Sequence, residues 1–271
     1  MALTTQDLLN SYARELILLC GKDGTGKSCA VVSTASLVEI LDSNAVFHVI
    51  DTENKFRSAV RSFGENAPNN LSYTQVDTIN QAIDALGNVL SDYKPGDWLG
   101  GESVGRLWDM AQDHASRVIA GVSKVQYLRM AKGEETPTGI KKGGGPIPSP
   151  DDYWKICKGA YDGDFMYPII ARTDLNVILT TTIAKAPKAD SFIKENVDRK
   201  AARVELGIDF GLDGAPRLPY QPETLAVLQL AAGKVSCRVL RDNNSKNENT
   251  RPEFDVADRG SWAQAFWQEA R

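Results

Sequence analysis

Apolar and polar positions divide the beginning of the chain into a strand, a loop, a helix and a second strand. Residues 16–20 form a continuous apolar run, as expected for a parallel strand that is buried on both faces. Residues 29–41 carry apolar positions at helical spacing, and residues 45–50 form a second apolar run. This order predicts a βαβ unit, preceded by a short helix at 4–13.

The rest of the chain continues to alternate between strand and helix patterns. Further strands are predicted at 71–76, 97–103 and 175–182, and further helices at 78–90, 104–125 and 151–172. The strand prediction at 97–103 is weak, because Gly100 and Gly101 stand where bulky apolar residues normally fill a buried strand. A hairpin is expected from 224–230 and 234–241, and a last helix from about residue 259.

These patterns predict an α/β fold, with a mostly parallel twisted sheet, helices on both faces and an antiparallel hairpin near the C-terminus. We expect a single domain over residues 1–271, divided into a helix at 1–13, a core at 14–242 and a tail with a helix at 243–271. Residues 131–150 are rich in glycine, lysine and proline, which predicts a mobile loop within the core.

Composition and charge narrow the class of protein. Apolar residues make up 42% of the chain and charged residues 24%, which is the balance of an ordinary globular protein. The net charge of −4 argues against wholesale binding to nucleic acid or anionic membranes. The run at 16–20 is too short for a signal peptide or a membrane span, and the four cysteines match no metal-binding spacing. We therefore expect a cytoplasmic protein with reduced thiols.

One motif identifies a phosphate-binding loop. Residues 21–28 read Gly21-Lys22-Asp23-Gly24-Thr25-Gly26-Lys27-Ser28 and match G-x-x-x-x-G-K-[ST] in full. The glycines let backbone amides approach an anion closely, and the following helix, from Cys29, presents its N-terminal amides to that anion. Lys27 would reach the β- and γ-phosphates, and the Ser28 hydroxyl would ligate Mg²⁺. The segment from Gly21 to Cys29 therefore predicts a site for ATP, or a closely similar nucleoside triphosphate, with Mg²⁺.

Two carboxylates are candidates for the chemistry. Hydrolysis needs a positioned water and a metal anchor, and Glu53 follows the second strand at the edge where the loop should lie. We expect Glu53 to orient the attacking water; alternatively, Asp51 and Glu53 only cap the next helix. Glu102 ends the strand at 97–103 and is the candidate Mg²⁺ anchor.

In order and spacing, these segments resemble the RecA-like branch of P-loop ATPases, over residues 14–242. The likeness is greatest to phage RecA-like nucleotide-binding proteins, which include single-strand annealing ATPases. Residues 21–28 resemble the Walker A loop, and Glu53 matches the catalytic glutamate. Residues 98–104 resemble the Walker B strand, which normally runs through apolar residues to Asp-Ser but here reads Gly-Gly-Glu-Ser. Glu102 at this position suggests slow hydrolysis.

The resemblance implies further site residues and a multi-subunit assembly. The strand at 177–182 is similar to the one that senses the γ-phosphate, which assigns that role to Thr181 or Thr182. Arg241 matches a late basic residue that reaches the nucleotide of a neighbouring subunit. A homo-oligomer is therefore expected.

The resemblance also implies single-stranded DNA as a partner, through two loops at 131–145 and 183–205. The first loop carries Lys132, Lys141 and Lys142. The second carries Lys185, Lys188, Lys194, Arg199, Lys200 and Arg203. Basic, glycine-containing loops suit a phosphate backbone, but four acidic residues dilute the second, and both could be ordinary solvated loops. Tyr153, beside Trp154, is a candidate for stacking on bases.

The expected function is thus that of a Mg²⁺-dependent RecA-like ATPase in DNA recombination, annealing or repair. The resemblance points to a phage-encoded protein acting in the host cytoplasm, with no membrane partner. A nucleotide-binding scaffold with little hydrolysis is the main alternative. A P-loop kinase is a third possibility, disfavoured because no arginine-rich lid is evident.

Overall fold

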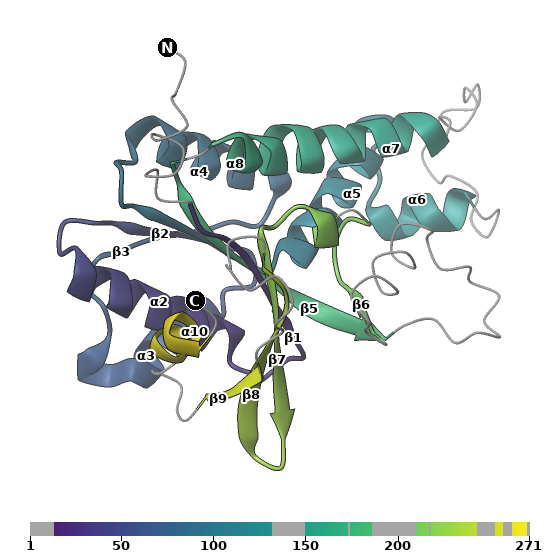
Figure 1. Ribbon diagram of the computed structural model, residues 1–271. Coiled ribbons are helices and arrows are strands. Elements are labelled where there is room, and N and C mark those ends of the chain that lie inside the picture. The colour runs from purple at the N-terminus through teal and green to yellow at the C-terminus, as the bar shows by residue number, and fades with distance from the viewer. Residues whose placement is uncertain are drawn as a thin grey trace, which may run out of the picture.

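The computed structural model describes residues 14–131, 150–172, 174–185, 210–216, 218–242, 253–256 and 262–269. Within this part of the chain, a sheet is covered by helices on both faces (Figure 1). One face carries α2 (Lys27–Leu41), α3 (Phe56–Phe63) and α10 (Trp262–Glu269). The other carries α4 (Ile79–Asp92), α5 (Val104–Ala120), α6 (Lys124–Ala131), α7 (Pro150–Lys158), a π-helical segment (Gly159–Met166) and α8 (Tyr167–Ala171). The predicted α/β architecture is confirmed at this level.

The sheet is mixed but mostly parallel. Its strands are β1 (Leu16–Gly21), β2 (Phe47–Asp51), β3 (Leu71–Gln75), β4 (Trp98–Glu102), β5 (Asn176–Lys185), β6 (Phe210–Leu212), β7 (Thr224–Ala231), β8 (Lys234–Asp242) and β9 (Glu253–Val256). They follow the order β3-β2-β4-β5-β1-β7-β8-β9, and β6 pairs with β5. In sheet order, the neighbouring strands from β3 through β2, β4, β5 and β1 to β7 pair in parallel. By contrast, β6 pairs antiparallel with β5, β8 with β7, and β9 with β8.

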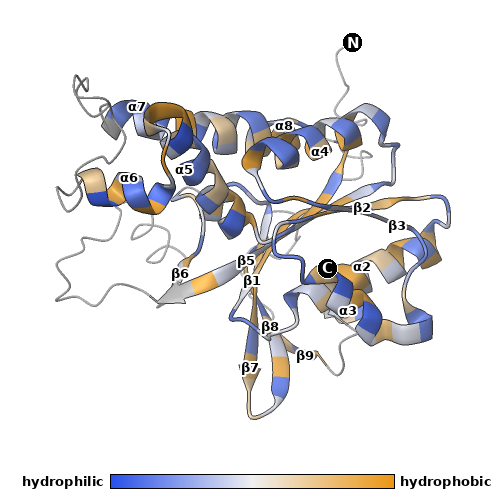
Figure 2. Ribbon diagram, turned by 180° about the vertical axis from the view of Figure 1, so that it is seen from behind, coloured by the Kyte–Doolittle hydropathy of each residue, from blue (hydrophilic) through white to orange (hydrophobic). Residues whose placement is uncertain are grey.

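Strand β1 lies in the middle of the sheet and explains the first apolar run. Leu16, Leu18 and Cys20 belong to the apolar cluster on one face of the sheet, and Ile17 and Leu19 belong to the cluster on the other. Because successive side chains point to opposite faces, a strand covered on both sides needs apolar residues at every position. Figure 2 shows this hydrophobic character along the central strands.

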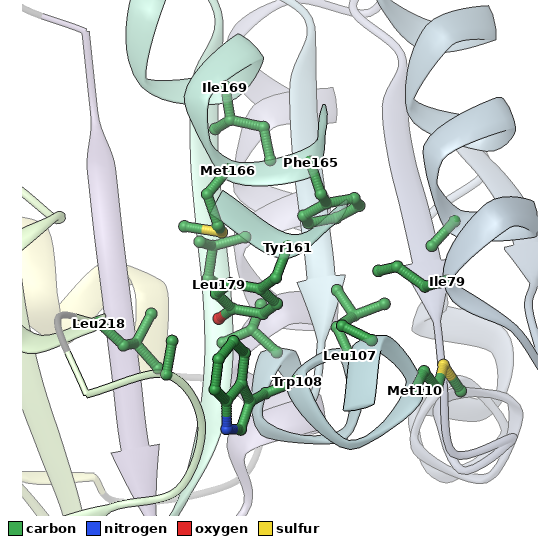
Figure 3. Close-up of a cluster of buried hydrophobic side chains, with 14 of the residues drawn as sticks. Ile79, Leu107, Trp108, Met110, Tyr161, Phe165, Met166, Ile169, Leu179 and Leu218 are labelled. Carbon is green, nitrogen blue, oxygen red and sulfur yellow. The ribbon is translucent and has the colours of Figure 1, made fainter. Parts of the chain in front are cut away.

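The larger cluster lies between the sheet and the helices that run from α4 to α8. Leu107 and Trp108 of α5 meet Tyr161, Phe165 and other residues of the π-helical segment above Leu179 of β5 (Figure 3). Trp108 contacts Tyr161 edge to face, with ring centroids 5.3 Å apart. This packing holds α5 against β5 and the neighbouring helices, so the turn that joins β4 to α5 has a defined position.

One sequence prediction needs correction. The helix predicted over 104–125 ends at Ala120, because Gly121 adopts a left-handed conformation (φ 66°) and caps it, and α6 then begins at Lys124. The strand predicted at 97–103 is confirmed as β4, and despite its two glycines it is a fully buried interior strand. The hairpin of β7 and β8 is confirmed, with its turn at Ala232 and Gly233, both at positive φ.

Some predictions lie outside the described residues. They are the helix at 4–13, most of the loop at 131–150, most of the segment at 183–205 and the start of the C-terminal tail at 243–252. Among the helices that the structure does describe, none has both the length and the apolar character to cross a membrane.

Candidate functional site

The carboxyl ends of four parallel strands bring the candidate residues to one edge of the sheet. Gly21, at the end of β1, pairs in register with Thr182 of β5, and Asp51 of β2 pairs with Glu102 of β4. Ligands of open α/β sheets bind at this edge. The sheet thus collects the loop and both carboxylates that the sequence singled out.

The loop between β1 and α2 wraps around an open helix N-terminus. Gly24 and Gly26 have φ values of 79° and 91°, which side chains with a Cβ rarely adopt. Gly26 caps α2 without any side-chain hydrogen bond, so the first amides of the helix have no side-chain acceptor there. The Lys27 ammonium donates to the carbonyl oxygens of Gly21 and Lys22, at 2.8 and 3.0 Å, and so lies across the loop. This arrangement suits a bound anion.

Gly21 is needed for a different reason. A Cβ at this position would lie 2.5 Å from the Thr25 hydroxyl oxygen and 2.8 Å from the carbonyl oxygen of Leu228. The close approach of β1 to β7 therefore leaves room only for glycine at the base of the loop.

Ser28 and Glu102 form a buried pair beside the loop. The Ser28 hydroxyl donates to Oε2 of Glu102 at 2.8 Å, while the other carboxylate oxygen, Oε1, is buried without a hydrogen-bond partner. Burial raises the pKa of Glu102 to about 7, against the opposing effect of the Ser28 hydrogen bond. An unpartnered oxygen in a buried carboxylate is a place that a cation would satisfy.

The donor set fits Mg²⁺ held together with a phosphate. Among the described residues, no group of three or more His, Cys, Asp and Glu side chains could form a metal site by itself. Mg²⁺ is commonly held by one or two protein oxygens, with waters and substrate phosphates completing its shell. Ser28 and Glu102 can supply those protein oxygens.

The two glycines of β4 are explained by their neighbours. A Cβ at Gly101 would lie 2.6 Å from Cδ2 of Leu179, and one at Gly100 would lie 3.0 Å from Phe47 and 3.1 Å from Val31. Large side chains from other elements thus occupy the space that strand residues would normally fill. β4 still pairs with β2 and β5, and Glu102 lies at its carboxyl end, beside the ends of the neighbouring strands.

Asp51 and Glu53 have different roles, although both follow β2. Asp51 accepts from the backbone amides of Glu53, Asn54 and Phe56, and from the Tyr73 hydroxyl, at 2.9 to 3.1 Å. It therefore caps the turn before α3, as the alternative interpretation predicted. Glu53 is not part of this cap, because its Oε1 accepts from the Ser103 hydroxyl and its Oε2 from the Lys55 ammonium, each at 2.8 Å.

These two contacts set the charge of Glu53. Partial burial would raise its pKa, but the hydrogen bonds from Lys55 and Ser103 outweigh burial and hold the pKa below the ordinary value. Glu53 is therefore ionised at neutral pH. For Lys27, burial is the largest effect and lowers the pKa of the ammonium. The attraction of nearby carboxylates, of which Asp23 contributes most, opposes burial but does not outweigh it.

Ser103 and Thr180 complete the site and had not been predicted from the sequence. Ser103 adopts a left-handed conformation (φ 64°, ψ 65°) between β4 and α5, which is unusual for a residue with a side chain. In this turn its amide donates to the Thr180 hydroxyl at 2.9 Å, while its own hydroxyl reaches Glu53. A left-handed serine leaves no signature in a single sequence.

Two cavities adjoin the loop. One of about 450 Å³ is polar and is lined by Lys27, Ser28, Glu53, Lys55, Glu102, Ser103, Thr180 and Thr182, among others. The other, of about 480 Å³, is lined by Leu228, Leu230, Val235, Val256, Trp262, Lys234 and Asp255 and by loop and α2 residues. Both include Gly24, Gly26 and Cys29, so the loop forms the partition between them.

Thr182 and Thr181, the two candidates for γ-phosphate sensing, lie in different surroundings. Thr182 lines the polar cavity. Thr181 is fully buried and donates its hydroxyl to the carbonyl oxygen of Asp213 at 2.7 Å. Of the two, only Thr182 lies with the other candidate residues.

Arg241 is not brought to the site of its own chain. It pairs with Leu225, three residues before Leu228, which pairs with Gly21, so it lies about 10 Å further along the sheet. Its guanidinium donates to the carbonyl oxygens of Pro219 and Pro222, both at 2.7 Å. A role at a neighbouring subunit's nucleotide would require these contacts to be exchanged.

The proposed base-stacking residue is buried. Tyr153 is 2% exposed and stacks on Tyr127, with ring centroids 4.7 Å apart, so the stacking prediction for Tyr153 is wrong. Trp154 is 41% exposed and stacks on Trp108. The basic residues Lys132, Lys141, Lys142, Lys188, Lys194, Arg199, Lys200 and Arg203 lie outside the described residues.

The described residues thus place a phosphate-type loop, a buried hydroxyl–carboxylate pair and an ionised glutamate around one polar cavity. No protein-family model and no curated protein matches the chain.

Proposed function

We propose that this protein binds ATP with Mg²⁺ and hydrolyses it as a RecA-like ATPase that acts on DNA in recombination, annealing or repair. The observation that carries the proposal is the 2.8 Å hydrogen bond from Ser28 to Glu102, formed beside a complete G-x-x-x-x-G-K-S loop. A hydroxyl and a buried carboxylate held together at a helix N-terminus suit a metal–phosphate complex.

Each residue has a defined part in this proposal. The amides at the start of α2 and the Lys27 ammonium bind the phosphates, and Ser28 with Glu102 holds the metal. Mg²⁺, when bound, would neutralise charge on the phosphate oxygens. Glu53, ionised and anchored by Ser103, accepts a hydrogen bond from a water and orients it toward the terminal phosphorus.

The second cavity supports a nucleotide rather than inorganic phosphate as the ligand. It adjoins the loop opposite the polar cavity, and its walls include Leu228, Val235 and Val256. Its volume of about 480 Å³ falls within the ~300–1,000 Å³ typical of small-molecule sites. A nucleoside with its phosphates in the loop would place its base against this apolar wall, with Asp255 and Lys234 nearby as polar partners.

The binding step has a direct test. Calorimetry should detect ATP binding in the presence of Mg²⁺, and Lys27→Ala should weaken it about 100-fold or more, because a charge on the phosphates is lost. Lys94→Ala, on an exposed loop away from the site, serves as the matched control. Equal binding by Lys27→Ala and wild type would refute the proposal.

The DNA part of the proposal rests on the family resemblance and on the position of the flanking elements. The end of α6, the start of α7 and β6 lie on the same side of the molecule in both views (Figures 1 and 2). The first segment predicted to contact DNA, 131–145, begins at the last residue of α6 and precedes α7, and the second, 183–205, begins within β5 and precedes β6. Binding to single-stranded DNA should weaken steeply with salt. Unchanged affinity after neutralising Lys141 and Lys142 would exclude the first segment as the main contact.

A nucleotide-gated scaffold with little hydrolysis is the second candidate. It is favoured by one observation: both oxygens of Glu53 already have partners, Ser103 and Lys55. A carboxylate so engaged is a weaker base than a free one. Single-turnover hydrolysis, with and without single-stranded DNA, separates the two functions.

A further inference from the structure

A second lysine lies in the polar cavity with Lys27. Lys55 is the residue that precedes α3, and its Nζ atom lies 2.8 Å from Oε2 of Glu53. Its side chain lines the same cavity as Lys27, Ser28 and Glu102. The family resemblance assigns it no role.

The backbone around Lys55 is held by hydrogen bonds, whereas its side chain is exposed apart from its ion pair with Glu53. Asp51 accepts the amides of Glu53, Asn54 and Phe56, which fixes the turn on both sides of Lys55. The Lys55 side chain itself is 64% exposed. An ion pair exposed to this degree contributes little to stability, so a stronger anion can displace the carboxylate with little loss.

The ion pair also restrains Glu53. The hydrogen bond from Lys55 lowers the pKa of Glu53, and the same contact raises the pKa of Lys55. Removing the ammonium would restore basicity to the carboxylate, while Ser103 would still hold its other oxygen. The pair therefore keeps the water-orienting group in a less reactive state.

We propose that Lys55 distinguishes triphosphate from diphosphate: it pairs with Glu53 in the empty site and moves to the terminal phosphate when a triphosphate binds, which frees Glu53 to orient water. This inference rests on the proposed ATP site. The γ-phosphate brings additional negative charge into a cavity where the Lys55 ammonium already lies. A diphosphate lacks that group and leaves the pair with Glu53 intact. Lys55 is thus a positioning residue that acts on hydrolysis through Glu53.

The test compares two nucleotides on the full chain. Calorimetry would measure Mg²⁺·AMPPNP and Mg²⁺·ADP binding to wild type, Lys55→Met, Lys55→Arg and Arg57→Met. We expect Lys55→Met to weaken AMPPNP about tenfold or more and to change ADP binding less than twofold, with Lys55→Arg restoring most of the preference. Arg57 lies on α3 with its guanidinium over the Tyr73 ring, outside the cavity, so Arg57→Met should alter neither affinity.

The outcomes separate this inference from the proposed function. If wild type binds both nucleotides and Lys55→Met keeps the wild-type ratio of affinities, the role of Lys55 is refuted and the ATP site stands. If Lys55→Arg fails to restore the ratio while Lys55→Met has lost it, the ammonium acts by a route other than charge at the terminal phosphate, which also refutes the inference. If wild type binds neither nucleotide, both proposals fail.

Discussion

The hydroxyl of Ser28 donates a 2.8 Å hydrogen bond to the carboxylate of Glu102, although 74 positions separate the two residues in the chain. Ser28 lies in the first turn of α2, which follows β1, and Glu102 ends β4, with β5 between these two strands in the sheet. The contact therefore depends on how the sheet positions the loop relative to the end of β4. The candidate metal site depends on that relationship more than on either residue alone.

The buried carboxyl predicts an unusual dependence of stability on pH. Burial raises the pKa of Glu102 from 4.5 to about 7, so the contribution of this group to stability is fully present below pH 4.5 and is lost as pH rises through 7. Glu102→Gln removes the charge. In the nucleotide-free protein, the free energy of unfolding of the Glu102→Gln variant, relative to that of wild type, should rise by about 2–3 kcal/mol between pH 5 and pH 8. Denaturant unfolding across this range measures it.

Glu53→Gln is the matched control for that experiment. The pKa of Glu53 lies below its ordinary value of 4.5, so this group stays ionised between pH 5 and pH 8. The difference in unfolding free energy between Glu53→Gln and wild type should therefore be flat over that range. If Glu102→Gln is equally flat, Glu102 is not the buried carboxyl described here.

The glycines of β4 give a prediction about packing. Gly101→Ala would put a methyl group 2.6 Å from Cδ2 of Leu179, so it should destabilise the protein by about 1–3 kcal/mol. Gly87→Ala, in α4 with no atom near the added Cβ, should instead stabilise it by up to ~1 kcal/mol. Thermal or denaturant unfolding distinguishes the two signs.

Leu179 tests whether overpacking is the cause. The double variant Gly101→Ala with Leu179→Ala should be less destabilised than the sum of the two single variants, because the second change removes the atom that clashes. Additive effects would mean that the contact with Leu179 is not the cause.

The cavity of about 480 Å³ beside the loop, with Leu228, Val235 and Val256 in its wall, predicts a separation between nucleoside and phosphate recognition. Val256→Asp places a charge in the wall of that cavity and should weaken ATP binding about tenfold or more, while the affinity for inorganic tripolyphosphate stays within about twofold. Competition calorimetry with the two ligands measures both. Ile40→Asp, at a residue 80% exposed near the end of α2, is the control. Equal losses for both ligands would mean that the nucleoside lies elsewhere.

The central elements could be predicted because they depend on local pattern. A continuous apolar run is required of β1, which is covered on both faces, and the glycine pattern of the loop is required by its positive φ angles at Gly24 and Gly26. The end of α5 was misjudged because Val122 and Val125 continue the helical spacing beyond Gly121, whose left-handed cap outweighs that pattern.

The remaining features depend on contacts between distant segments. In the sequence, Gly100 and Gly101 indicate a weak strand. The strand is nevertheless well packed, because side chains from other strands, such as Phe47 and Leu179, fill the space beside the glycines. The sequence does not distinguish the roles of Asp51 and Glu53. The turn before α3 does: Asp51 accepts hydrogen bonds from its amides, whereas Glu53 accepts one from the Ser103 hydroxyl. The role proposed for Lys55 rests on its contact with Glu53 in the shared cavity, which the sequence does not reveal.

Single-turnover hydrolysis of ATP by wild type and Glu53→Gln, together with ATP affinity, tests the central claim most directly. The proposed site predicts that both proteins bind Mg²⁺·ATP with affinities within about threefold, because Lys27, Ser28 and Glu102 are intact. Phosphate release should fall about 100-fold or more in Glu53→Gln, because the water loses the group that orients it. Equal rates of hydrolysis in the two proteins, or no binding of Mg²⁺·ATP by wild type, would contradict it.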